Sequence, residues 1–498
     1  KIEMQPNIIY FVADQLRADA LHHLGNEASQ TPNLDALASE GISYANAYCQ
    51  NPVCVPSRCS FLTGLYPHTT GHRTIHYLQN EEEPNLMKTM KEQGYEVVWA
   101  GRNDVVAANH SFEAYCDVYF NGIDRENHRA DRSKKQPAKH PSTPNLSPSI
   151  KDTSVPGYYS HYLGKLSETQ AHQVNWAGND WAILDAVLDY LDHRQSDRPL
   201  FLYISLLFPH PPYGCEDPWY SQIDRSLIAE PRPSALELDK PSMLKGIAEK
   251  QQLNEWGKEN LRELRAVYLA MVSRFDYQFG LLRRKLIDRG LYDSSNIFVF
   301  SDHGDYTGDY QIVEKVQNCF EDPVSRVPLL IKPAAGMPVT PRISQALVEL
   351  TDLTATVEEL TGIQSDYVHF GKSLVPTFAQ EQEHHDAVFC EGGRIHGEIW
   401  AMERGHNADS PYWPRLSTQE SEGPEHTKAV MIRKGQFKYI KRLYERDELY
   451  DLKLDPLELV NRIDDPDYAG IVSSLKERML DWMIETGDIV PNRKDPRY

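Results

Sequence analysis

A cysteine, a proline, a serine and an arginine stand within five positions at Cys54-Val55-Pro56-Ser57-Arg58, and Thr63-Gly64 follows after four more residues. An isolated cysteine in a folded protein is most often a small buried hydrophobe. Pro56 suits the first turn of a helix, so Cys54 is predicted at a helix N-terminus, where free backbone N–H groups attract anions. Arg58 would lie one turn further on. The pattern therefore indicates a nucleophile beside an anion-binding site.

Two aspartates follow predicted buried strands. The apolar run from Ile8 to Ala13 ends at Asp14, and the run "SNIFVFS" ends at Asp302. Further strands are predicted within 94–101, 199–208 and 326–333, and they alternate with helical patterns at 31–41, 178–193 and 260–289. This alternation predicts an α/β fold with a largely parallel sheet, whose ligands bind beyond the carboxyl ends of the strands. Asp14 and Asp302 are expected at that edge.

The segment around Cys54 resembles the Cys-x-Pro-Ser-Arg-x4-Thr-Gly motif of the type I, formylglycine-dependent sulfatases, which belong to the alkaline phosphatase-like superfamily. The resemblance implies that Cys54 is converted to formylglycine by a formylglycine-generating enzyme, and that the aldehyde hydrate attacks sulfur. It also implies the superfamily's α/β fold, a mostly parallel sheet flanked by helices. Cys49 and Cys59 are expected to be bystanders, since only Cys54 has Pro and Arg at the required offsets.

The same resemblance implies a divalent metal site. "PNIIYFVADQ" is similar to the family's opening strand and "SDHGD" to its second metal segment, which makes Asp14, Gln15, Asp302 and His303 the expected ligands, with the hydrate at Cys54. This Asp, Gln, Asp and His set resembles the branch with choline sulfatases and phosphonate monoester hydrolases. Oxygen donors suit Ca²⁺, the preferred ion, while His303 admits Mn²⁺ as the alternative.

Three further positions carry over from the family. His210 in "FPHPPY" resembles the histidine that contacts the sulfate and protonates the leaving oxygen. Lys315, 13 residues after Asp302, stands where the family has a lysine that touches the sulfate and the leaving group. Arg58 matches the arginine that holds the hydrate oxygen.

One segment departs from the family pattern. Where the family usually has Gly-Lys-x-His, this chain has Gly101-Arg102-Asn103-Asp104. Arg102 keeps a positive charge and can grip an oxyanion with two N–H groups. Asp104 would repel sulfate unless it is paired or protonated. The base that releases sulfate is therefore open between Asp104 and a histidine from elsewhere, such as His110.

The length of 498 residues predicts more than one folding unit. We expect a catalytic domain at 1–380 with a Pro-, Ser- and Lys/Arg-rich insertion at 121–160, either a solvated loop or a basic lid. Residues 381–498 are expected to form a smaller α+β domain. Its last helix should carry a stripe of large apolar residues, namely Leu475, Met479, Leu480 and Met483.

The amino-acid composition limits the classes of partner that we expect. A net charge of −20 repels nucleic acid and anionic membranes, so neither is expected as a partner, and an anionic substrate needs local positive charge. No apolar run reaches the roughly 20 residues of a membrane span. Seven dispersed cysteines do not form a disulfide framework, which favours a reducing, cytoplasmic location. A removed leader and a homo-oligomer are both left open.

The leading hypothesis is a sulfuric ester hydrolase that cleaves an organic sulfate monoester, with a saccharide sulfate as the preferred small-molecule class. "ADSPYWPRL" supplies aromatic side chains for stacking on a sugar ring. The alternative is a phosphonate monoester or phosphodiester hydrolase with the same nucleophile. A third hypothesis, a binding protein that keeps only the scaffold, draws on the departures at Asn103 and Asp104, and the intact Cys54 motif argues against it.

Overall fold

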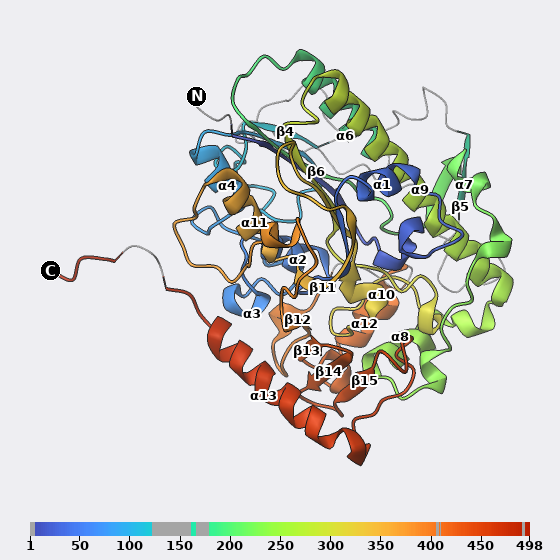
Figure 1. Ribbon diagram of the computed structural model, residues 1–498. Coiled ribbons are helices and arrows are strands. Elements are labelled where there is room, and N and C mark those ends of the chain that lie inside the picture. Colours follow the sequence, from blue (N-terminus) through green and yellow to red (C-terminus); the bar gives the residue numbers. More distant parts are fainter. Residues whose placement is uncertain (1–4, 122–160, 166–178, 405–407, 409, 491–493) are drawn as a thin grey trace.

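The computed structural model describes residues 5–121, 161–165, 179–404, 408, 410–490 and 494–498. In that part of the chain, nine strands form a central sheet with helices on both faces, and a smaller sheet lies towards the C-terminus (Figure 1). The order of the central sheet is β11-β2-β10-β8-β1-β6-β3-β4, with β9 paired to β2. These strands are β1 (Asn7–Ala13), β2 (Ile42–Tyr48), β3 (Glu96–Gly101), β4 (Val118–Phe120), β6 (Leu200–Ser205), β8 (Ser295–Ser301), β9 (Arg326–Val327), β10 (Leu329–Lys332) and β11 (Arg342–Glu349).

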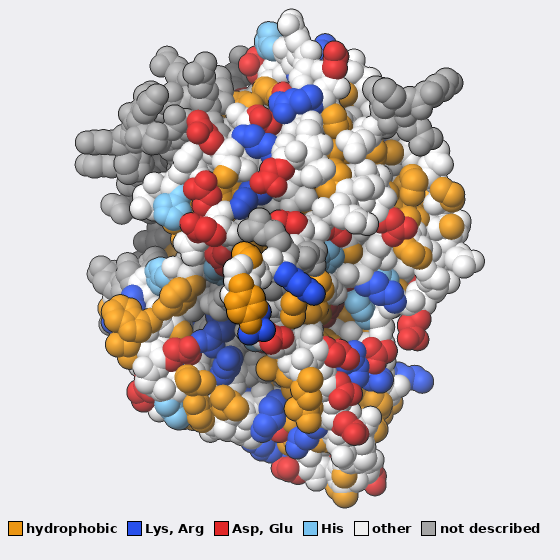
Figure 2. Space-filling model, turned by 90° about the vertical axis from the view of Figure 1, so that its left-hand side faces the viewer, with side chains coloured by type: hydrophobic (Ala, Val, Ile, Leu, Met, Phe, Trp, Pro, Cys, Tyr) orange, Lys and Arg blue, Asp and Glu red, His pale blue; other side chains and the backbone are white. Residues whose placement is uncertain are grey.

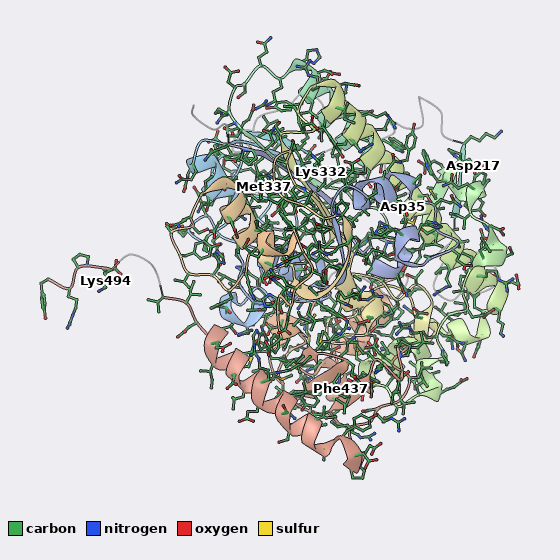
Figure 3. All side chains as sticks on the ribbon, viewed as in Figure 1. Asp35, Asp217, Lys332, Met337, Phe437 and Lys494 are labelled. Atoms are coloured by element: carbon green, nitrogen blue, oxygen red, sulfur yellow. The ribbon has the colours of Figure 1, made fainter. Side chains whose placement is uncertain are left out.

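Strand β1 separates two apolar cores, and its side chains alternate between them. Ile9 and Phe11 pack into the core that includes α1 (Pro32–Ala38), α6 (Asn179–His193) and α9 (Lys258–Asp288). Ile8 and Tyr10 pack into the opposite core, which includes α2 (Cys54–Phe61), α4 (Leu86–Glu92) and α11 (Asp352–Thr361). Because both faces are covered, the strand is apolar throughout rather than alternating with polar residues. Figure 3 shows side chains filling the space on both sides of the sheet.

The expectation of a largely parallel sheet is confirmed. Strand β1 lies between β6 and β8 and is parallel to both, and β3 is parallel to β6 and β4. Strand β10, which corresponds to the predicted strand at 326–333, is antiparallel to β8 and β2. After β8 the chain stays at the carboxyl edge of the sheet through residues 302–321 and re-enters from that edge, so β10 must run in the opposite direction.

The C-terminal region has the expected α+β composition. Four antiparallel strands form its sheet, namely β12 (Ala387–Gly392), β13 (Ala429–Lys434), β14 (Phe437–Arg442) and β15 (Glu448–Asp451). Helix α13 (Ala469–Thr486) covers one face of this sheet (Figure 1). Its buried stripe is Val472, Leu475, Met479 and Trp482. The prediction for Leu480 and Met483 is wrong: both are exposed, because the helix turns Trp482 instead of Met483 towards the sheet.

The structure also bears on what the sequence indicated about cysteines, membrane spans, surface charge and the insertion. All seven cysteines are unpaired and buried, so they form no disulfide framework. Across the described residues, every helix is too short or too polar to span a lipid bilayer. Acidic and basic side chains are interspersed over the face drawn in Figure 2. The insertion expected at 121–160 lies outside the described residues except for its first position.

Candidate active site

The two strand-end aspartates lie side by side. Strands β1 and β8 are parallel neighbours in a register that places Ala13 opposite Ser301, so Asp14 and Asp302 follow at the same edge. Both side chains are fully buried. Gln15 adopts a φ of 72°, which turns the chain sharply and lets its backbone N–H donate to Asp302 Oδ1 at 3.0 Å. The strand ends thus position both carboxylates without help from any long loop.

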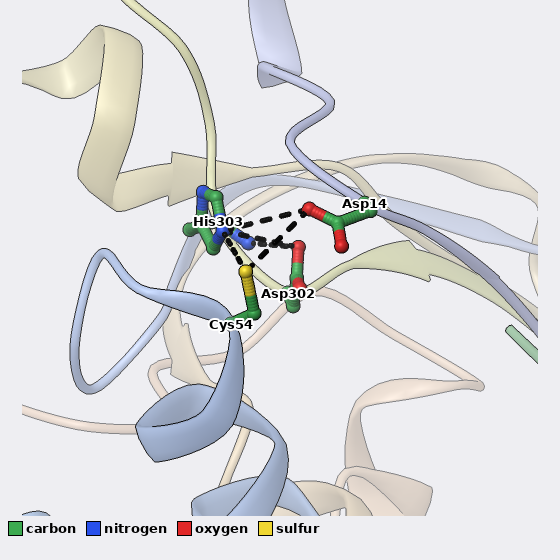
Figure 4. A group of neighbouring side chains, drawn as sticks. All are labelled: Asp14, Cys54, Asp302 and His303. Carbon is green, nitrogen blue, oxygen red and sulfur yellow. Dashed lines mark hydrogen bonds and ion pairs between the residues drawn. The ribbon is translucent and has the colours of Figure 1, made fainter. Parts of the chain in front are cut away.

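Helix α2 begins at Cys54, as predicted, and brings the thiol to this edge. The Sγ atom lies 3.5 Å from His303 Nε2 and 3.9 Å from Asp14 Oδ1 (Figure 4). Ser57, one turn along the helix, donates from Oγ to the backbone carbonyl of Asp302 at 2.5 Å and ties the helix to the end of β8. Burial raises the pKa of the Cys54 thiol, and nearby carboxylates raise it further, so the thiol is neutral and a poor nucleophile at neutral pH.

Arg58 anchors both carboxylates from inside the core. Its Nε donates to Asp302 Oδ2 at 3.0 Å and its Nη2 donates to Asp14 Oδ2 at 3.2 Å. The guanidinium also donates to the hydroxyls of Tyr203 and Ser205 on β6. Burial opposes the charge, but the carboxylates raise the pKa of Arg58 above its usual value, so it stays charged. Arg58 therefore takes the Oδ2 atoms and leaves both Oδ1 atoms facing the other way.

The remaining carboxylate oxygens converge with a histidine nitrogen. His303 Nε2 lies 3.7 Å from Asp14 Oδ1 and 3.7 Å from Asp302 Oδ1. His303 Nδ1 lies 2.9 Å from the carbonyl oxygen of Gly304, which can only accept a hydrogen bond, so Nε2 carries the free lone pair. One ligand atom from each of Asp14, Cys54, Asp302 and His303 lies within 4.8 Å of the others. Two carboxylates, an imidazole and the residue 54 side chain thus fit a divalent cation.

Gln15 points its amide oxygen into the same space. Its Nε2 donates to Asp305 Oδ2 at 2.7 Å, which leaves Oε1 to accept from Lys315 Nζ at 3.2 Å. Asp305 was not identified from the sequence. It is held by the hydroxyls of Tyr213 and Thr307, and burial raises its pKa. Its position two residues after His303 was the available signal.

Lys315 and His210 complete the cluster opposite the carboxylates. Lys315 Nζ lies 3.4 Å from Cys54 Sγ and 3.2 Å from His210 Nε2. Burial works against the charge of Lys315, but Cys54 and then the carboxylates of Glu314 and Asp14 raise its pKa, so the amine is protonated. Burial and the adjacent Lys315 lower the pKa of His210 well below its usual value, so the imidazole is neutral.

The segment that departs from the family pattern also reaches the site. Arg102 Nη1 lies 3.1 Å from Asp14 Oδ2, and its Nε lies 2.9 Å from Asp104 Oδ2. Asp104 is also 3.9 Å from Arg58 Nε, so its negative charge is paired. His110 has no contact with this cluster among the described residues. Burial would raise the pKa of Asp14, but Arg102, Arg58 and Lys315 lower it well below its usual range and keep it ionised.

Of the residues selected from the sequence for chemistry, the structure brings together ten and leaves out His110. The ten are Asp14, Gln15, Cys54, Arg58, Arg102, Asp104, His210, Asp302, His303 and Lys315.

A further wall of the site comes from residues about 100 positions beyond Lys315, within the segment "ADSPYWPRL" whose aromatic side chains the sequence analysis considered for stacking on a sugar. The sequence did not predict the contacts that this segment makes. Arg415 on α12 (Trp413–Gln419) donates from Nε to Glu314 Oε2 at 3.0 Å, next to Lys315. Tyr412 donates from its hydroxyl to the carbonyl of Pro211 at 3.1 Å, next to His210. No local pattern marks these contacts, because each joins segments far apart in the chain.

Comparisons with known proteins show the family and the fold. A family model described as Sulfatase matches residues 6–363. The choline-sulfatase of Rhizobium meliloti (strain 1021) is 26% identical, over 99% of this chain and 90% of that protein. The solved phosphonate monoester hydrolase of Agrobacterium radiobacter superposes with a TM-score of 0.75 at 21% identity, over 98% of this chain and 100% of that one. The structure titled BT1596, a 2-O GAG sulfatase, has a TM-score of 0.70 at 20% identity, over 97% and 92% of the chains. The chain therefore belongs to the sulfatase family and is a hydrolase of sulfate esters.

Proposed function

We propose that this protein hydrolyses an organic sulfate monoester to an alcohol and sulfate, with a formylglycine hydrate made from Cys54 as the nucleophile. The observation that carries the proposal is the contact of Cys54 Sγ with His303 and Lys315 at the edge where Asp14 and Asp302 meet. Burial leaves the thiol itself protonated, so the side chain as encoded is a poor nucleophile there. Conversion to an aldehyde hydrate supplies an oxygen nucleophile at the same position.

The carboxylate side of the site fits a divalent cation, for which we propose Ca²⁺. Asp14, Asp302 and His303 would hold it, with the Gln15 amide oxygen as a further ligand. When bound, such an ion withdraws charge from the sulfuryl oxygens and stabilises the charge that develops during attack. Arg58 positions both carboxylates from behind and excludes water from their Oδ2 atoms.

Positive charge on the protein prepares the site for an anionic ester. Arg102 is about a quarter exposed, while Lys315 is buried, so the two cations lie at different depths beside the residue 54 side chain. Fixed N–H donors in a water-poor site stabilise a developing oxyanion without reorganisation. We infer that Arg102 and Lys315 bind the sulfuryl oxygens and so offset the net charge of −20 locally.

The proton for the departing alcohol is assigned to Lys315. His210 Nδ1 lies 2.5 Å from the carbonyl of Pro211, which can only accept, so His210 Nε2 has no proton when the ring is neutral. The protonated Lys315 therefore donates to His210. We infer that Lys315 is the proton donor and that His210 orients its amine.

Asp104 is assigned as the base that accepts a proton when sulfate is released. It stands where many family members have a histidine, and it is about a quarter exposed and paired with Arg102. A paired carboxylate near the residue 54 side chain can accept a proton without the repulsion that an isolated carboxylate would cause.

For the alcohol part we propose a saccharide. Tyr412 lies with its ring 6.2 Å from the ring of His210, so an aromatic side chain borders the leaving-group end of the site. Aromatic rings beside such a site suit the apolar face of a sugar. The structural neighbour titled a 2-O GAG sulfatase supports the same substrate class.

The test is mass spectrometry of the peptide that contains residue 54, from protein co-expressed with a formylglycine-generating enzyme, together with hydrolysis assays of Cys54→Ala. We expect the aldehyde at residue 54 and loss of hydrolysis in the variant. Cys59→Ala is the matched control, because Cys59 is buried in the same helix and its thiol forms no hydrogen bond with the site residues in the described structure, and it should retain activity. An unmodified thiol combined with full activity of Cys54→Ala would overturn the proposal.

A phosphonate monoester hydrolase is the second candidate. Gln15 in place of a second acid, with Asp302-His303, is the feature that resembles that branch. Turnover of a sulfate and a phosphonate ester of the same phenol separates the two functions. Faster cleavage of the phosphonate would reverse the ranking.

A further inference from the structure

His396, Glu422 and His426 form a second cluster of potential metal ligands, in the C-terminal region and outside the active site. His396 Nδ1 lies 3.0 Å from His426 Nε2 and 3.5 Å from Glu422 Oε2, and the latter two atoms are 3.7 Å apart. A triangle with these edges has a centre about 2.0 Å from each corner, which is the bond length of Zn²⁺ to histidine nitrogen and carboxylate oxygen. The three atoms could therefore bind one ion with little movement.

The surrounding contacts orient the ligand atoms towards that centre. His426 Nδ1 lies 3.2 Å from the carbonyl of Arg394, so this nitrogen is the donor and Nε2 presents its lone pair. Arg394 Nη1 donates to Glu422 Oε1 at 2.9 Å, and the backbone N–H of Gly397 donates to Glu422 Oε2 at 3.0 Å, which leaves Oε2 one lone pair for an ion. The ring of His396 stacks on Tyr444 with centroids 3.6 Å apart. Outer contacts of this kind, to a backbone carbonyl and an arginine, are what fix the ligands of metal sites in proteins.

The cluster is reachable from solvent. His426 is fully buried, whereas the side chains of His396 and Glu422 are about half exposed. A free ion can therefore enter from the surface and keep a water molecule as its fourth ligand. Without an ion, His396 Nδ1 must donate its proton to His426 Nε2, since His426 Nδ1 already donates to Arg394. Metal binding requires only that this proton move to the other nitrogen of His396.

A third cluster, Asp352 with His384 and His385, differs in how its carboxylate is hydrogen-bonded. Both imidazoles point at Asp352, whose oxygens also accept the backbone N–H groups of Glu349 at 2.9 Å and Lys372 at 3.0 Å. Asp352 is thus saturated by donors, and this cluster is an ion-pair network. In the His396 cluster the two ring nitrogens face each other instead.

We propose that His396, Glu422 and His426 form a Zn²⁺-type site that fastens one wall of the active site. His396 lies in the loop after β12, and Glu422 and His426 lie between α12 and β13. Helix α12 carries Arg415, which holds Glu314 beside Lys315. An ion bound here therefore joins the surface loop to the segment that positions Lys315.

The experiment is calorimetric titration of the chelator-stripped whole chain with ZnCl₂. Excess CaCl₂ is present to occupy the oxygen-rich active site, and Ca²⁺ competes poorly for imidazole ligands. We expect one Zn²⁺ per chain for the wild type. His396→Ala and Glu422→Gln should each weaken binding at least about 100-fold. Both side chains are half exposed, so these variants should fold. His193→Ala, which removes a largely exposed histidine on α6, should bind like the wild type.

Two further readouts make the result decisive. CoCl₂ should give visible absorption bands of a four-coordinate site in the wild type but not in His396→Ala. Zn²⁺ should raise the melting temperature of the wild type and not that of His396→Ala. Absence of Zn²⁺ binding by the wild type, or equal binding by His396→Ala, would overturn the proposal. The wild type and His396→Ala are compared with residue 54 in the same state, so any ion held at Cys54 and His303 contributes equally to both.

Discussion

Lys315 Nζ lies 3.2 Å from Nε2 of His210, whose other ring nitrogen faces the carbonyl of Pro211. This arrangement makes the lysine the donor and the histidine the acceptor. Both side chains are buried, and the lysine keeps its charge while the histidine is neutral. A reaction that needs a proton on the leaving oxygen can therefore draw it from Lys315.

The first prediction concerns this proton. Lys315→Ala should lower kcat by about 10²- to 10⁴-fold for a phenyl sulfate, because a poor leaving group needs general-acid help. The loss should be much smaller for 4-nitrophenyl sulfate, whose leaving group needs little protonation. His210→Gln, which keeps a hydrogen-bond acceptor, should retain more activity than His210→Ala. Equal losses on both esters would assign the proton donor elsewhere.

The second prediction concerns Asp104. If this carboxylate promotes sulfate release, Asp104→Asn should still release one equivalent of alcohol rapidly and then turn over slowly, about 10²- to 10⁴-fold below the wild type. Rapid-quench measurement of alcohol against sulfate resolves the two steps. His110→Ala, which alters the other candidate base, should turn over normally. Loss of the initial burst in Asp104→Asn would contradict this role.

The third prediction concerns Arg58, which is fully buried between the carboxyl groups of Asp14 and Asp302. Arg58→Met should destabilise the protein by about 3–5 kcal/mol, because removing one partner leaves uncompensated charge in the core. Thermal unfolding in chelator measures the effect. Arg225→Met removes a partly exposed arginine paired with Glu263 and should cost about 1 kcal/mol or less. Similar melting temperatures for both variants would refute the argument.

The fourth prediction concerns the metal. Chelation should abolish hydrolysis, and Ca²⁺ should restore it more fully than Mn²⁺ if oxygen ligands dominate the site. The measurement should be repeated in His396→Ala, which lacks the second proposed site, and the same order of ions is expected. Full activity in chelator would show that the carboxylates of Asp14 and Asp302 act without an ion.

The fifth prediction concerns pH and stability. Burial raises the pKa of Glu349 from its usual 4.5 to about 7, so the folded protein holds a proton that the unfolded chain releases between these values. Stability from this group is therefore full below about pH 4.5 and is lost as pH rises to about 7, by up to about 3 kcal/mol.

Glu349→Gln mimics the protonated form and tests this sign. The melting temperature of the variant relative to the wild type should rise between about pH 5 and about pH 8. Glu381→Gln is a control, because that carboxylate is more exposed and its pKa is lowered rather than raised. A constant difference across the pH range would mean that Glu349 does not titrate in the folded state.

Local sequence patterns determined much of this protein. The motif around Cys54 predicted a helix start, and α2 begins there. The apolar runs before Asp14 and Asp302 predicted strands with acidic ends. Because parallel neighbours end at the same edge of a sheet, two residues 288 positions apart could be placed together from these patterns alone.

The tertiary structure decided what these patterns leave open. The direction of β10 depends on the edge from which the chain returns, and the buried face of α13 depends on the sheet that it meets. The amide orientation of Gln15 is set by Asp305, and the wall beside Lys315 is set by Arg415, across 290 and 101 positions respectively. Hydrophobic periodicity and residue propensity indicate the structure of the segment in which a residue lies. The features above depend instead on which distant segment packs against that one.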